Sequence, residues 1–269
     1  MSLPDAKTVD LRIVEITYRE KGRGPALMFV HGLGGGSAAW SEQFEAFADR
    51  YRVISWDGPG YGRSGDFLTE TPMVSDYVDV LARFLDALAV EGAHLVGHSF
   101  GGIIVAGYNR RFPARVLSLT LLQAVTGSGG LEPGKLQELT KARRTQVESM
   151  APKDFAEFRA RKALAAGASP ALVARAAEVS YSVRPRGYLQ AYQAMCAANI
   201  FDELAGIAAP ALVIAGENDS TAPQENCRSI AEAVPGSRFL TIEGTGHVIY
   251  MEAAERLNAC LGEFLADVG

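Results

Sequence analysis

Short apolar runs bounded by Gly, Pro or Asp recur along the chain. Most of these runs are continuous rather than alternating, which is the pattern of strands whose two faces are both covered by helices. We therefore expect strands in seven runs: residues 10–20, 26–30, 52–56, 93–97, 116–123, 211–216 and 237–243.

The segments between these runs have the apolar spacing of helices. It is clearest over residues 73–90, where the apolar positions recur every three or four residues. We expect helices over residues 38–50, 73–90, 100–111, 224–234 and 253–266. Strands that alternate with helices predict an α/β fold with an open, mostly parallel sheet.

One long segment interrupts this alternation. Residues 126–204 contain no convincing strand, begin with Thr-Gly-Ser-Gly-Gly and continue in a run rich in Ala, Lys, Arg and Glu. A structureless loop of this length is improbable in a compact domain. We expect a helical cap over residues 126–204, inserted into one core domain made of residues 1–125 and 205–269.

Composition narrows the class of protein. With 269 residues and 48% hydrophobic content, the chain can bury a core, which excludes disorder. A net charge of −5 argues against nucleic acid as a partner. No apolar run approaches a membrane span and the first residues lack a secretion signal, so we expect a cytoplasmic protein, monomeric or homodimeric.

The three cysteines indicate neither a disulfide framework nor a metal site. Cys196, Cys227 and Cys260 are odd in number, form no C-x-x-C pair and have no histidine at a metal-ligand spacing. We expect three free thiols in a reducing compartment and no metal.

Charge is unevenly distributed. Residues 131–190 hold eleven Lys and Arg against six Asp and Glu, although the whole chain is acidic. A basic cap could attract an anionic substrate through its local potential, but these charges could also be ordinary solvated helix faces. Arg184 and Arg186, which flank Pro185, and the nearby Tyr188 are the cap residues that we expect to face the site and contact the substrate.

The strongest chemical motif follows the expected strand 93–97. Gly97-His98-Ser99-Phe100-Gly101 has the form G-x-S-x-G, between an apolar strand and an apolar helix. The glycines allow a tight turn that lifts the serine hydroxyl out of the sheet. An ordinary glycine turn is the alternative, but the position favours Ser99 as a nucleophile.

A serine nucleophile needs a base, and the chain has four histidines. His94 lies within a strand, His98 adjoins the serine and His31 belongs to a glycine loop. The remaining histidine is His247, in a loop directly after the last expected strand, where such a base must lie. We predict His247 as the base.

The acid that orients this base should follow another strand. Asp219 lies on the loop after residues 211–216, with Glu217 in reserve. The other possible position, at the end of residues 116–123, holds Gln123 and no carboxylate. The order Ser99, Asp219, His247 is the nucleophile–acid–base order of α/β hydrolases.

A glycine loop after residues 26–30 predicts an oxyanion hole. It reads His31-Gly32-Leu33-Gly34-Gly35-Gly36-Ser37, and we expect the Leu33 and Phe100 amides to be the two donors. The neighbouring positions His31, Gly32 and Gly34, together with Val248 beside the base, are expected substrate contacts. A dinucleotide fingerprint is the competing interpretation, but Ser37 occupies the third glycine position.

These motifs together resemble the α/β-hydrolase superfamily over essentially the whole chain. The matching segments are residues 31–34, 56–64, 97–102, 216–219 and 244–247. The resemblance implies a mostly parallel eight-stranded sheet flanked by helices, a Ser99–His247–Asp219 triad and no cofactor. For the turn at residues 57–64 we expect a structural role near the site.

Within the superfamily, Arg186-Gly187-Tyr188 and Asp202-Glu203-Leu204 resemble the 3-oxoadipate enol-lactonase-like and meta-cleavage C–C hydrolase branches. Val248 stands where the C–C hydrolases usually carry tryptophan, which counts against them. Ser99 stands where dehalogenases and epoxide hydrolases carry aspartate, which disfavours both.

The expected function is hydrolysis of a small carboxylic ester or lactone, including an enol-lactone or another anionic substrate, through an acyl-enzyme. The alternatives are hydrolysis of a carbon–carbon bond in a vinylogous diketone, perhydrolysis as a side activity, and a non-catalytic small-molecule receptor on the same fold.

Overall fold

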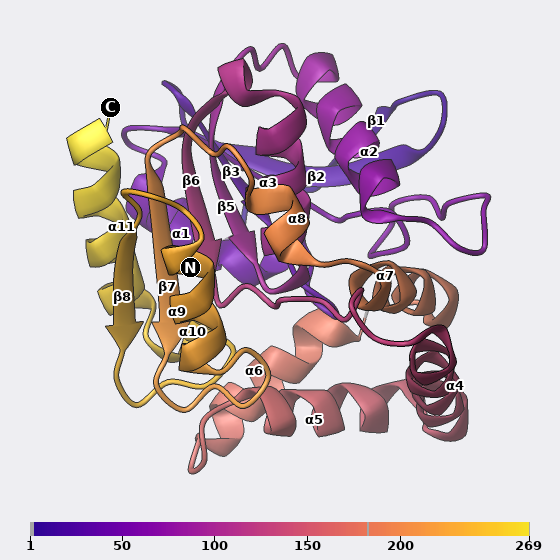
Figure 1. Ribbon diagram of the computed structural model, residues 1–269. Coiled ribbons are helices and arrows are strands. Elements are labelled where there is room, and N and C mark those ends of the chain that lie inside the picture. The colour runs from indigo at the N-terminus through magenta and orange to yellow at the C-terminus, as the bar shows by residue number, and fades with distance from the viewer. Residues whose placement is uncertain (1–2, 182, 269) are drawn as a thin grey trace.

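A sheet of eight strands forms the centre of the computed structural model, which describes residues 3–181 and 183–268 (Figure 1). The strands are β1 (Lys7–Asp10), β2 (Glu15–Lys21), β3 (Ala26–Val30), β4 (Arg52–Trp56), β5 (Ala93–His98), β6 (Val116–Leu122), β7 (Ala211–Gly216) and β8 (Arg238–Ile242). Their order is β1-β2-β4-β3-β5-β6-β7-β8. The strands β3 to β8 run parallel, while β2 is antiparallel to both neighbours. The predicted α/β class is confirmed.

The sheet differs from the sequence expectation at its first edge. Residues 10–20, expected as one strand, belong to two strands joined by a turn in which Arg12 has a left-handed φ of 67°. The Arg12 amide donates to Asp10 Oδ1 at 2.7 Å and fixes this turn. Because β1 is an edge strand with mostly exposed side chains, its apolar pattern could not separate it from β2.

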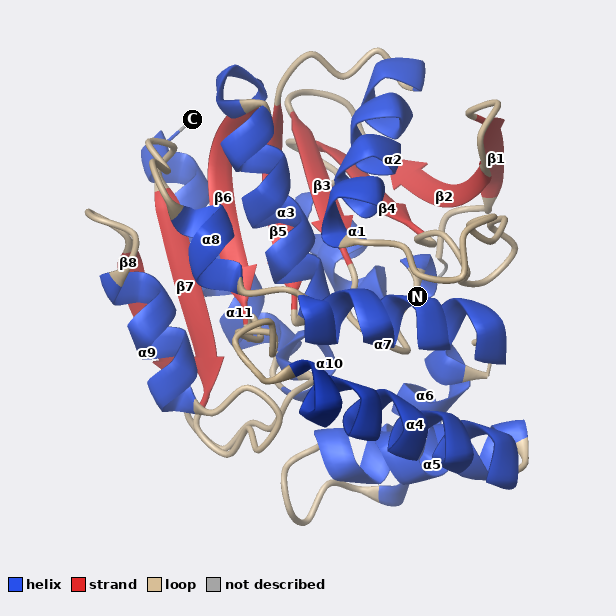
Figure 2. Cartoon of the chain, turned by 45° about the vertical axis from the view of Figure 1, so that its right-hand side comes forward, coloured by secondary structure: helices blue, strands red, loops and turns tan. Residues whose placement is uncertain are grey.

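Helices cover both faces of the sheet (Figure 2). They are η1 (Ser37–Trp40), α1 (Ser41–Phe47), α2 (Val74–Ala87), α3 (Phe100–Arg111), η2 (Pro113–Arg115), α4 (Pro133–Ser149), α5 (Pro152–Ala163), α6 (Pro170–Ser180), α7 (Pro185–Ala197), α8 (Ile200–Leu204), α9 (Gln224–Glu232), α10 (Ile249–Glu252) and α11 (Ala254–Val268). In Figure 2, α2, α3, α8 and α9 lie in front of the sheet, with α1 and α11 behind it.

The hydrophobic core has two layers, one on each face of the sheet. Successive side chains of β3 alternate between them: Leu27 and Phe29 pack with the layer that contains α1 and α11, whereas Met28 and Val30 pack with the layer of α2 and α3. All four side chains are fully buried. This explains why the strand reads as one continuous apolar run.

Four helices, α4 to α7, lie between β6 and β7 in sequence and beyond the carboxyl ends of the strands (Figure 1). We call residues 128–198 the helical insert. The chain enters and leaves it side by side, because Gly127 and Asn199 form an antiparallel bridge and the Gly129 amide donates to the Ala198 carbonyl at 2.7 Å. Helix α8, which the sequence grouped with the cap, instead packs against α3 of the core.

The described residues include no helix that is long and apolar enough to cross a membrane. In that part of the chain, no group of three or more His, Cys, Asp and Glu side chains could hold a metal ion. Cys196, Cys227 and Cys260 are free thiols, as predicted, and the first two are buried.

Candidate active site

Ser99 lies at the turn between β5 and α3 in a strained backbone conformation. Its φ of 54° and ψ of −118° are unusual for a residue with a side chain. A Cβ atom on Gly97 would lie 2.4 Å from the Gly101 carbonyl oxygen, and one on Gly101 would lie 2.2 Å from the Val30 carbonyl oxygen. Both glycines are therefore required to hold the serine in this turn.

His247 and Asp219 form a buried hydrogen bond of 2.7 Å between Nδ1 and Oδ2. Because an ionised carboxylate can only accept, Nδ1 carries the proton and Nε2 of a neutral imidazole keeps its lone pair. The other carboxylate oxygen of Asp219, Oδ1, accepts from the amides of Thr221 and Ala222 at 2.8 and 2.9 Å. Glu217, the reserve acid, instead accepts from the Gly244 amide at the surface.

The loop that carries His247 is held from several sides. His98 Nε2 donates to the His247 carbonyl oxygen at 2.8 Å, and burial lowers the pKa of His98, which keeps it neutral. The Glu252 carboxylate accepts from the amides of Gly246 and Val248, at 2.9 and 3.0 Å, and from the Ala165 amide of the insert at 2.9 Å. The His247 loop is thus fixed to both the core and the insert.

The glycine loop after β3 runs directly beside Ser99. A Cβ atom on Gly32 would lie 2.7 Å from the Ser99 Cβ. In the described part of the chain, the Leu33 amide donates to no backbone or side-chain acceptor. The Phe100 amide is the first of α3, where helical amides have no partner within the helix. Both amides are thus available near Ser99.

His31 is placed differently from the sequence expectation. Its Nε2 accepts from the Gly58 amide at 2.9 Å and its Nδ1 donates to the Gly32 carbonyl at 2.8 Å, so the ring links two loops. Burial lowers the pKa of His31, which favours this neutral form. The neighbouring Asp57 accepts from the Ser37 amide at 2.6 Å. His31 and Asp57 hold the glycine loop, and neither lines the cavity above Ser99.

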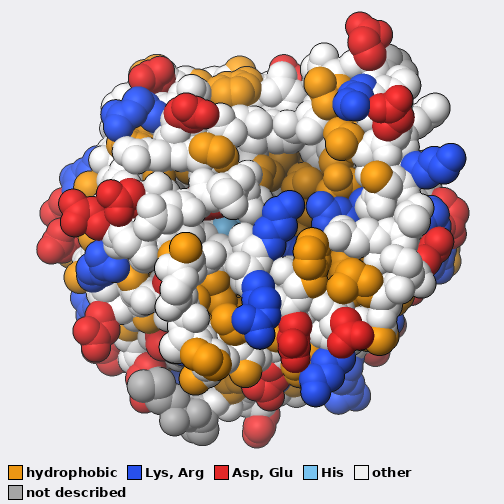
Figure 3. All heavy atoms as spheres, turned by 90° about the horizontal axis from the view of Figure 1, so that it is seen from below, with side chains coloured by type: hydrophobic (Ala, Val, Ile, Leu, Met, Phe, Trp, Pro, Cys, Tyr) orange, Lys and Arg blue, Asp and Glu red, His pale blue; other side chains and the backbone are white. Residues whose placement is uncertain are grey.

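A cavity of about 360 Å³ lies between the core and the helical insert. Figure 3 shows the hollow from the side of the insert, with Lys and Arg side chains at its border and a histidine visible inside. Ser99, His247 and Leu33 line it together with residues 125–127, 220, 221 and 226 of the core and with Ser128, the first residue of the insert. The insert contributes Arg143, Phe158, Arg159, Lys162, Ala163, Tyr188, Tyr192 and Met195.

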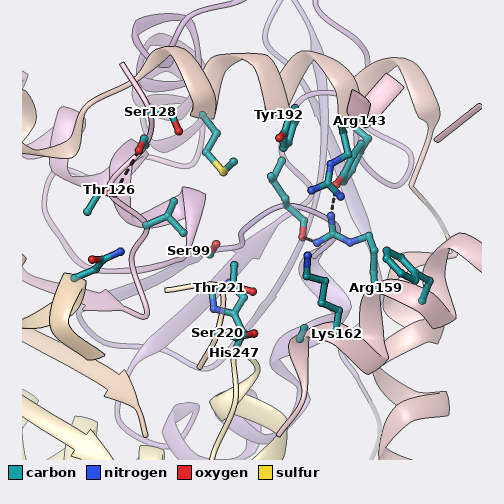
Figure 4. A pocket seen from close by; sticks show the side chains of 18 residues that line it. Ser99, Thr126, Ser128, Arg143, Arg159, Lys162, Tyr192, Ser220, Thr221 and His247 are labelled. Carbon is teal, nitrogen blue, oxygen red and sulfur yellow. Dashed lines mark hydrogen bonds between the residues drawn. The ribbon is translucent and has the colours of Figure 1, made fainter. Parts of the chain in front are cut away.

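Three cations lie together on one side of this cavity. Figure 4 places Arg143, Arg159 and Lys162 there, with Ser99, Thr126 and Ser128 on the opposite side. None of the three cations forms an ion pair with a carboxylate of the described residues, and no described Asp or Glu lines the cavity. We call Arg143, Arg159 and Lys162 the cationic wall.

Each cation of the wall is held differently. The Arg143 guanidinium lies 4.7 Å from the ring centre of Tyr192. Arg159 donates to the Leu33 carbonyl oxygen at 2.7 Å and to the Tyr188 hydroxyl. Lys162 has no hydrogen-bond acceptor among the described residues, so its ammonium group is free to meet a ligand.

The two arginines expected to face the site lie elsewhere. Arg184 donates to the carbonyl oxygens of Gly62 and Ser64 and to Asp66, and Arg186 pairs with Glu70. Neither lines the cavity, so the expectation for both is corrected. They lie at the start of α7, on the side that docks on the loop after β4.

Of the remaining expected substrate contacts, some line the cavity above Ser99 and others do not. Tyr188 lines the cavity, as expected. Gly34, with a left-handed φ of 74°, lies against Arg159, whose guanidinium carbon would be 3.1 Å from an added Cβ. Val248 lines a separate cavity of about 40 Å³ next to His247.

Several residues of the site were missed by the sequence. Arg159 and Lys162 are three residues apart on α5, so they share one helix face, and this spacing was the signal available. Gln123 directly follows β6 and contacts Asp219, but it was set aside there because it is not an acid.

The sequence profile described as the alpha/beta hydrolase fold matches residues 25–254. The chain belongs to this family. One relative of this α/β hydrolase is the 2-hydroxymuconate semialdehyde hydrolase of Pseudomonas sp. strain CF600, with 31% identity over 94% of the chain and 91% of the relative. Another is the (E)-2-((N-methylformamido)methylene)succinate hydrolase of Acinetobacter baylyi, with 28% identity over 92% and 93%.

A similar solved structure is the enol-lactonase from Burkholderia xenovorans LB400. Its TM-score is 0.87 at 23% identity, and the match covers 97% of this chain and 100% of the other. At this identity, the likeness supports the fold and not the substrate.

Proposed function

We propose that this α/β hydrolase is a serine hydrolase of small carboxylic esters or lactones. The observation that carries the proposal is the buried 2.7 Å bond between His247 and Asp219, beside a cavity that Ser99 and His247 both line. A serine, a base and an orienting acid are the groups that acyl transfer needs, and this chemistry requires no cofactor.

In the first step, Ser99 Oγ attacks the carbonyl carbon while His247 Nε2 takes its proton. Asp219 keeps the Nδ1 proton in place and stabilises the imidazolium. The Leu33 and Phe100 amides stabilise the negative oxygen of the tetrahedral intermediate, and one such donor contributes about 2.7–4 kcal/mol. The imidazolium then protonates the leaving oxygen, and an acyl-enzyme forms on Ser99.

In the second step, His247 takes a proton from water as the water oxygen attacks the acyl carbon. The imidazolium then gives this proton to Ser99 Oγ, the bond to Ser99 breaks, and the carboxylic acid is released. The helical insert lies over this reaction as a cap. Its carbonyl at Ala163 accepts from the His247 amide at 2.6 Å, and Arg159 holds the Leu33 carbonyl. We propose that the insert excludes water and selects the substrate.

The proposed substrate carries a carboxylate or another negative group. The cationic wall supports this, because its three positive side chains lie together on one side of the cavity without acidic partners, and a negative group on the substrate would offset their mutual repulsion. The names of the relatives agree: one acts on a succinate derivative and another on a muconate semialdehyde. The uncharged polar residues Thr126, Ser128 and Asn226 would contact the other end of the substrate.

Covalent labelling tests the serine mechanism. A fluorophosphonate probe should label the parent protein at Ser99, and Ser99→Ala should abolish the label. Ser37→Ala is the control, because Ser37 is a buried serine that does not line the cavity. Undiminished labelling of Ser99→Ala would refute the proposed nucleophile.

Carbon–carbon bond hydrolysis is the second candidate, favoured by 31% identity to the muconate semialdehyde hydrolase. Val248, in place of the tryptophan usual in that branch, argues against it. If the protein bleaches a yellow ring-cleavage dienoate faster than it hydrolyses any ester or lactone, carbon–carbon bond hydrolysis is favoured over the proposed function.

A further inference from the structure

Gln123 joins the two loops that carry the acid and the base. Its Nε2 donates to Asp219 Oδ2 at 2.8 Å and to the Gly246 carbonyl oxygen, one residue before His247. Its Oε1 accepts from the Ile249 amide at 3.3 Å. The side chain is completely buried, and both of its polar atoms are used in these contacts.

The backbone is shaped to place this side chain. Gln123 has a left-handed φ of 47°, which costs free energy for a residue that is not glycine, and its amide donates to the Ile214 carbonyl at 2.7 Å. A Cβ atom on Gly216 would lie 2.9 Å from Gln123 Nε2. The backbone at the end of β6 is therefore strained, and Gly216 at the end of β7 leaves the space that the Gln123 amide occupies.

The contacts of Asp219 are divided between its two oxygens. Oδ1 accepts only backbone amides, from Thr221 and Ala222, whereas Oδ2 accepts from both Gln123 and His247. The Gln123 donor is thus the side-chain contact that selects which oxygen faces the imidazole. Its N–H dipole also points its positive end toward the acid–base pair.

We propose that Gln123 is a positioning residue of the His247–Asp219 pair, which aligns the carboxylate and limits the basicity of the imidazole. The catalytic consequence rests on the proposed serine hydrolase function. Gln123 itself does not line the cavity, so it acts through Asp219 and not on the substrate.

Among the described residues, charged groups lie near this pair: Glu252 of α10, whose carboxylate accepts from the amides of Gly246 and Val248, and Arg159 and Lys162 of α5, which line the same cavity as His247. The titratable groups His98, from the end of β5, and Cys227, from α9, also face the pair. Burial lowers the pKa of His98 and raises the pKa of Cys227 to about 12, so both are neutral around pH 7. Replacing Gln123 with a neutral side chain such as Met therefore changes the dipole next to the pair without changing a charge.

The first test is Gln123→Met, which keeps the length of the side chain and removes the donor. We expect kcat to fall about tenfold or more while KM stays within about twofold. Without the N–H dipole, the imidazolium is favoured, so the acidic limb of kcat/KM should move upward by about half a pH unit.

The second test is Gln123→Glu, which keeps the shape. Two carboxyl groups that share one site cannot both ionise readily, so the new Glu should stay protonated and donate to Asp219. We expect activity near pH 6 close to that of the parent and a loss of about tenfold or more by pH 9, as the shared proton is lost. This variant still tests the role of Gln123 if Gln123→Met fails to fold.

Gln43→Met is the matched control, because Gln43 is an equally buried amide, on α1, whose Nε2 donates to Asn258 at 3.0 Å and to the Tyr250 carbonyl at 3.5 Å, and to neither Asp219 nor the His247 loop. An unchanged pH profile in both Gln123 variants, like that of Gln43→Met, would overturn the proposal. An NMR titration of His247 in the Ser99→Ala background needs no turnover. It therefore decides the role of Gln123 even if the probe never labels Ser99.

Discussion

Arg159 in the helical insert donates from Nη2 to the carbonyl oxygen of Leu33, 2.7 Å away. The insert therefore holds the loop whose amide is the proposed oxyanion donor. We predict that Arg159→Met lowers kcat about tenfold on neutral and anionic esters alike, because the loop loses its support. Steady-state kinetics measure this, with Arg161→Met as the control on the same helix. An unchanged kcat on the neutral ester would disprove the prediction that Arg159 supports the Leu33 loop.

The other two cations should act on substrate binding instead. We predict that Lys162→Met and Arg143→Met each raise KM for 4-nitrophenyl hydrogen glutarate about tenfold and change KM for 4-nitrophenyl pentanoate, the uncharged analogue, less than about twofold. Added salt should weaken the preference of the parent. Arg144→Met is the control, since Arg144 pairs with Glu148. If these substitutions change KM equally for the two esters, the proposal that the substrate carries a negative group is wrong.

Arg184 should matter for stability and not for substrate choice. Its guanidinium bonds Gly62, Ser64 and Asp66, so we predict that Arg184→Met lowers the free energy of unfolding by about 1–2 kcal/mol. The ratio of kcat/KM for the two esters should stay unchanged. Arg186→Met, which removes an exposed pair with Glu70, should cost less than about 1 kcal/mol. If either variant loses the preference for the anionic ester, the substituted arginine does act on the substrate.

Buried histidines should make the fold sensitive to acid. Burial lowers the pKa of His31 and His98 in the folded chain, whereas the unfolded chain binds protons with the ordinary pKa of 6.5. Below about pH 6.5 the unfolded state takes up protons that the folded state does not, so stability falls as the pH falls. The slope is about 1.4 kcal/mol per pH unit for each histidine.

Urea denaturation at pH 7.5 and pH 5.5 measures this slope. In His98→Gln, where the amide can still donate to the His247 carbonyl, the loss of stability between the two pH values should be smaller than in the parent. An identical loss in both proteins would show that His98 does not contribute.

A pair of glycines sets the contact between α7 and the loop after β4. A Cβ atom on Gly187 would lie 2.2 Å from the Gly60 carbonyl oxygen. We predict that Gly187→Ala lowers the free energy of unfolding by about 1–3 kcal/mol. Gly134→Ala, on the open face of α4, should instead raise it by up to about 1 kcal/mol. Equal melting temperatures for the two variants would contradict this.

The sequence predicted those parts of the site that are set by local backbone geometry. Ser99 could be found because its turn requires Gly97 and Gly101, and glycines at fixed spacing are visible in a sequence. His247 and Asp219 could be found because loops at the carboxyl ends of parallel strands meet at one edge of the sheet. The core strands were equally visible, since their burial on both faces leaves continuous apolar runs.

The cationic wall could not be predicted in the same way. A helix with many Lys and Arg residues has several charged faces, and only the packing of α5 and α4 over the core decides which face meets the cavity. Composition therefore indicated a basic insert but pointed to Arg184 and Arg186 rather than Arg159 and Lys162. Gln123 was missed for another reason: its importance lies in a donor to Asp219, 96 residues away.

The bridge between Gly127 and Asn199 places the start and the end of the insert next to each other. The roughly seventy residues between them form a long loop on a closed base, and the sheet is continuous on either side of it. A segment of different length and sequence could therefore be grafted at these two positions without re-threading any strand. Substrate range in this scaffold can thus change by exchange of one contiguous module, provided that the new module again supports the loops of Leu33 and His247, which the present insert holds through Arg159 and Ala163.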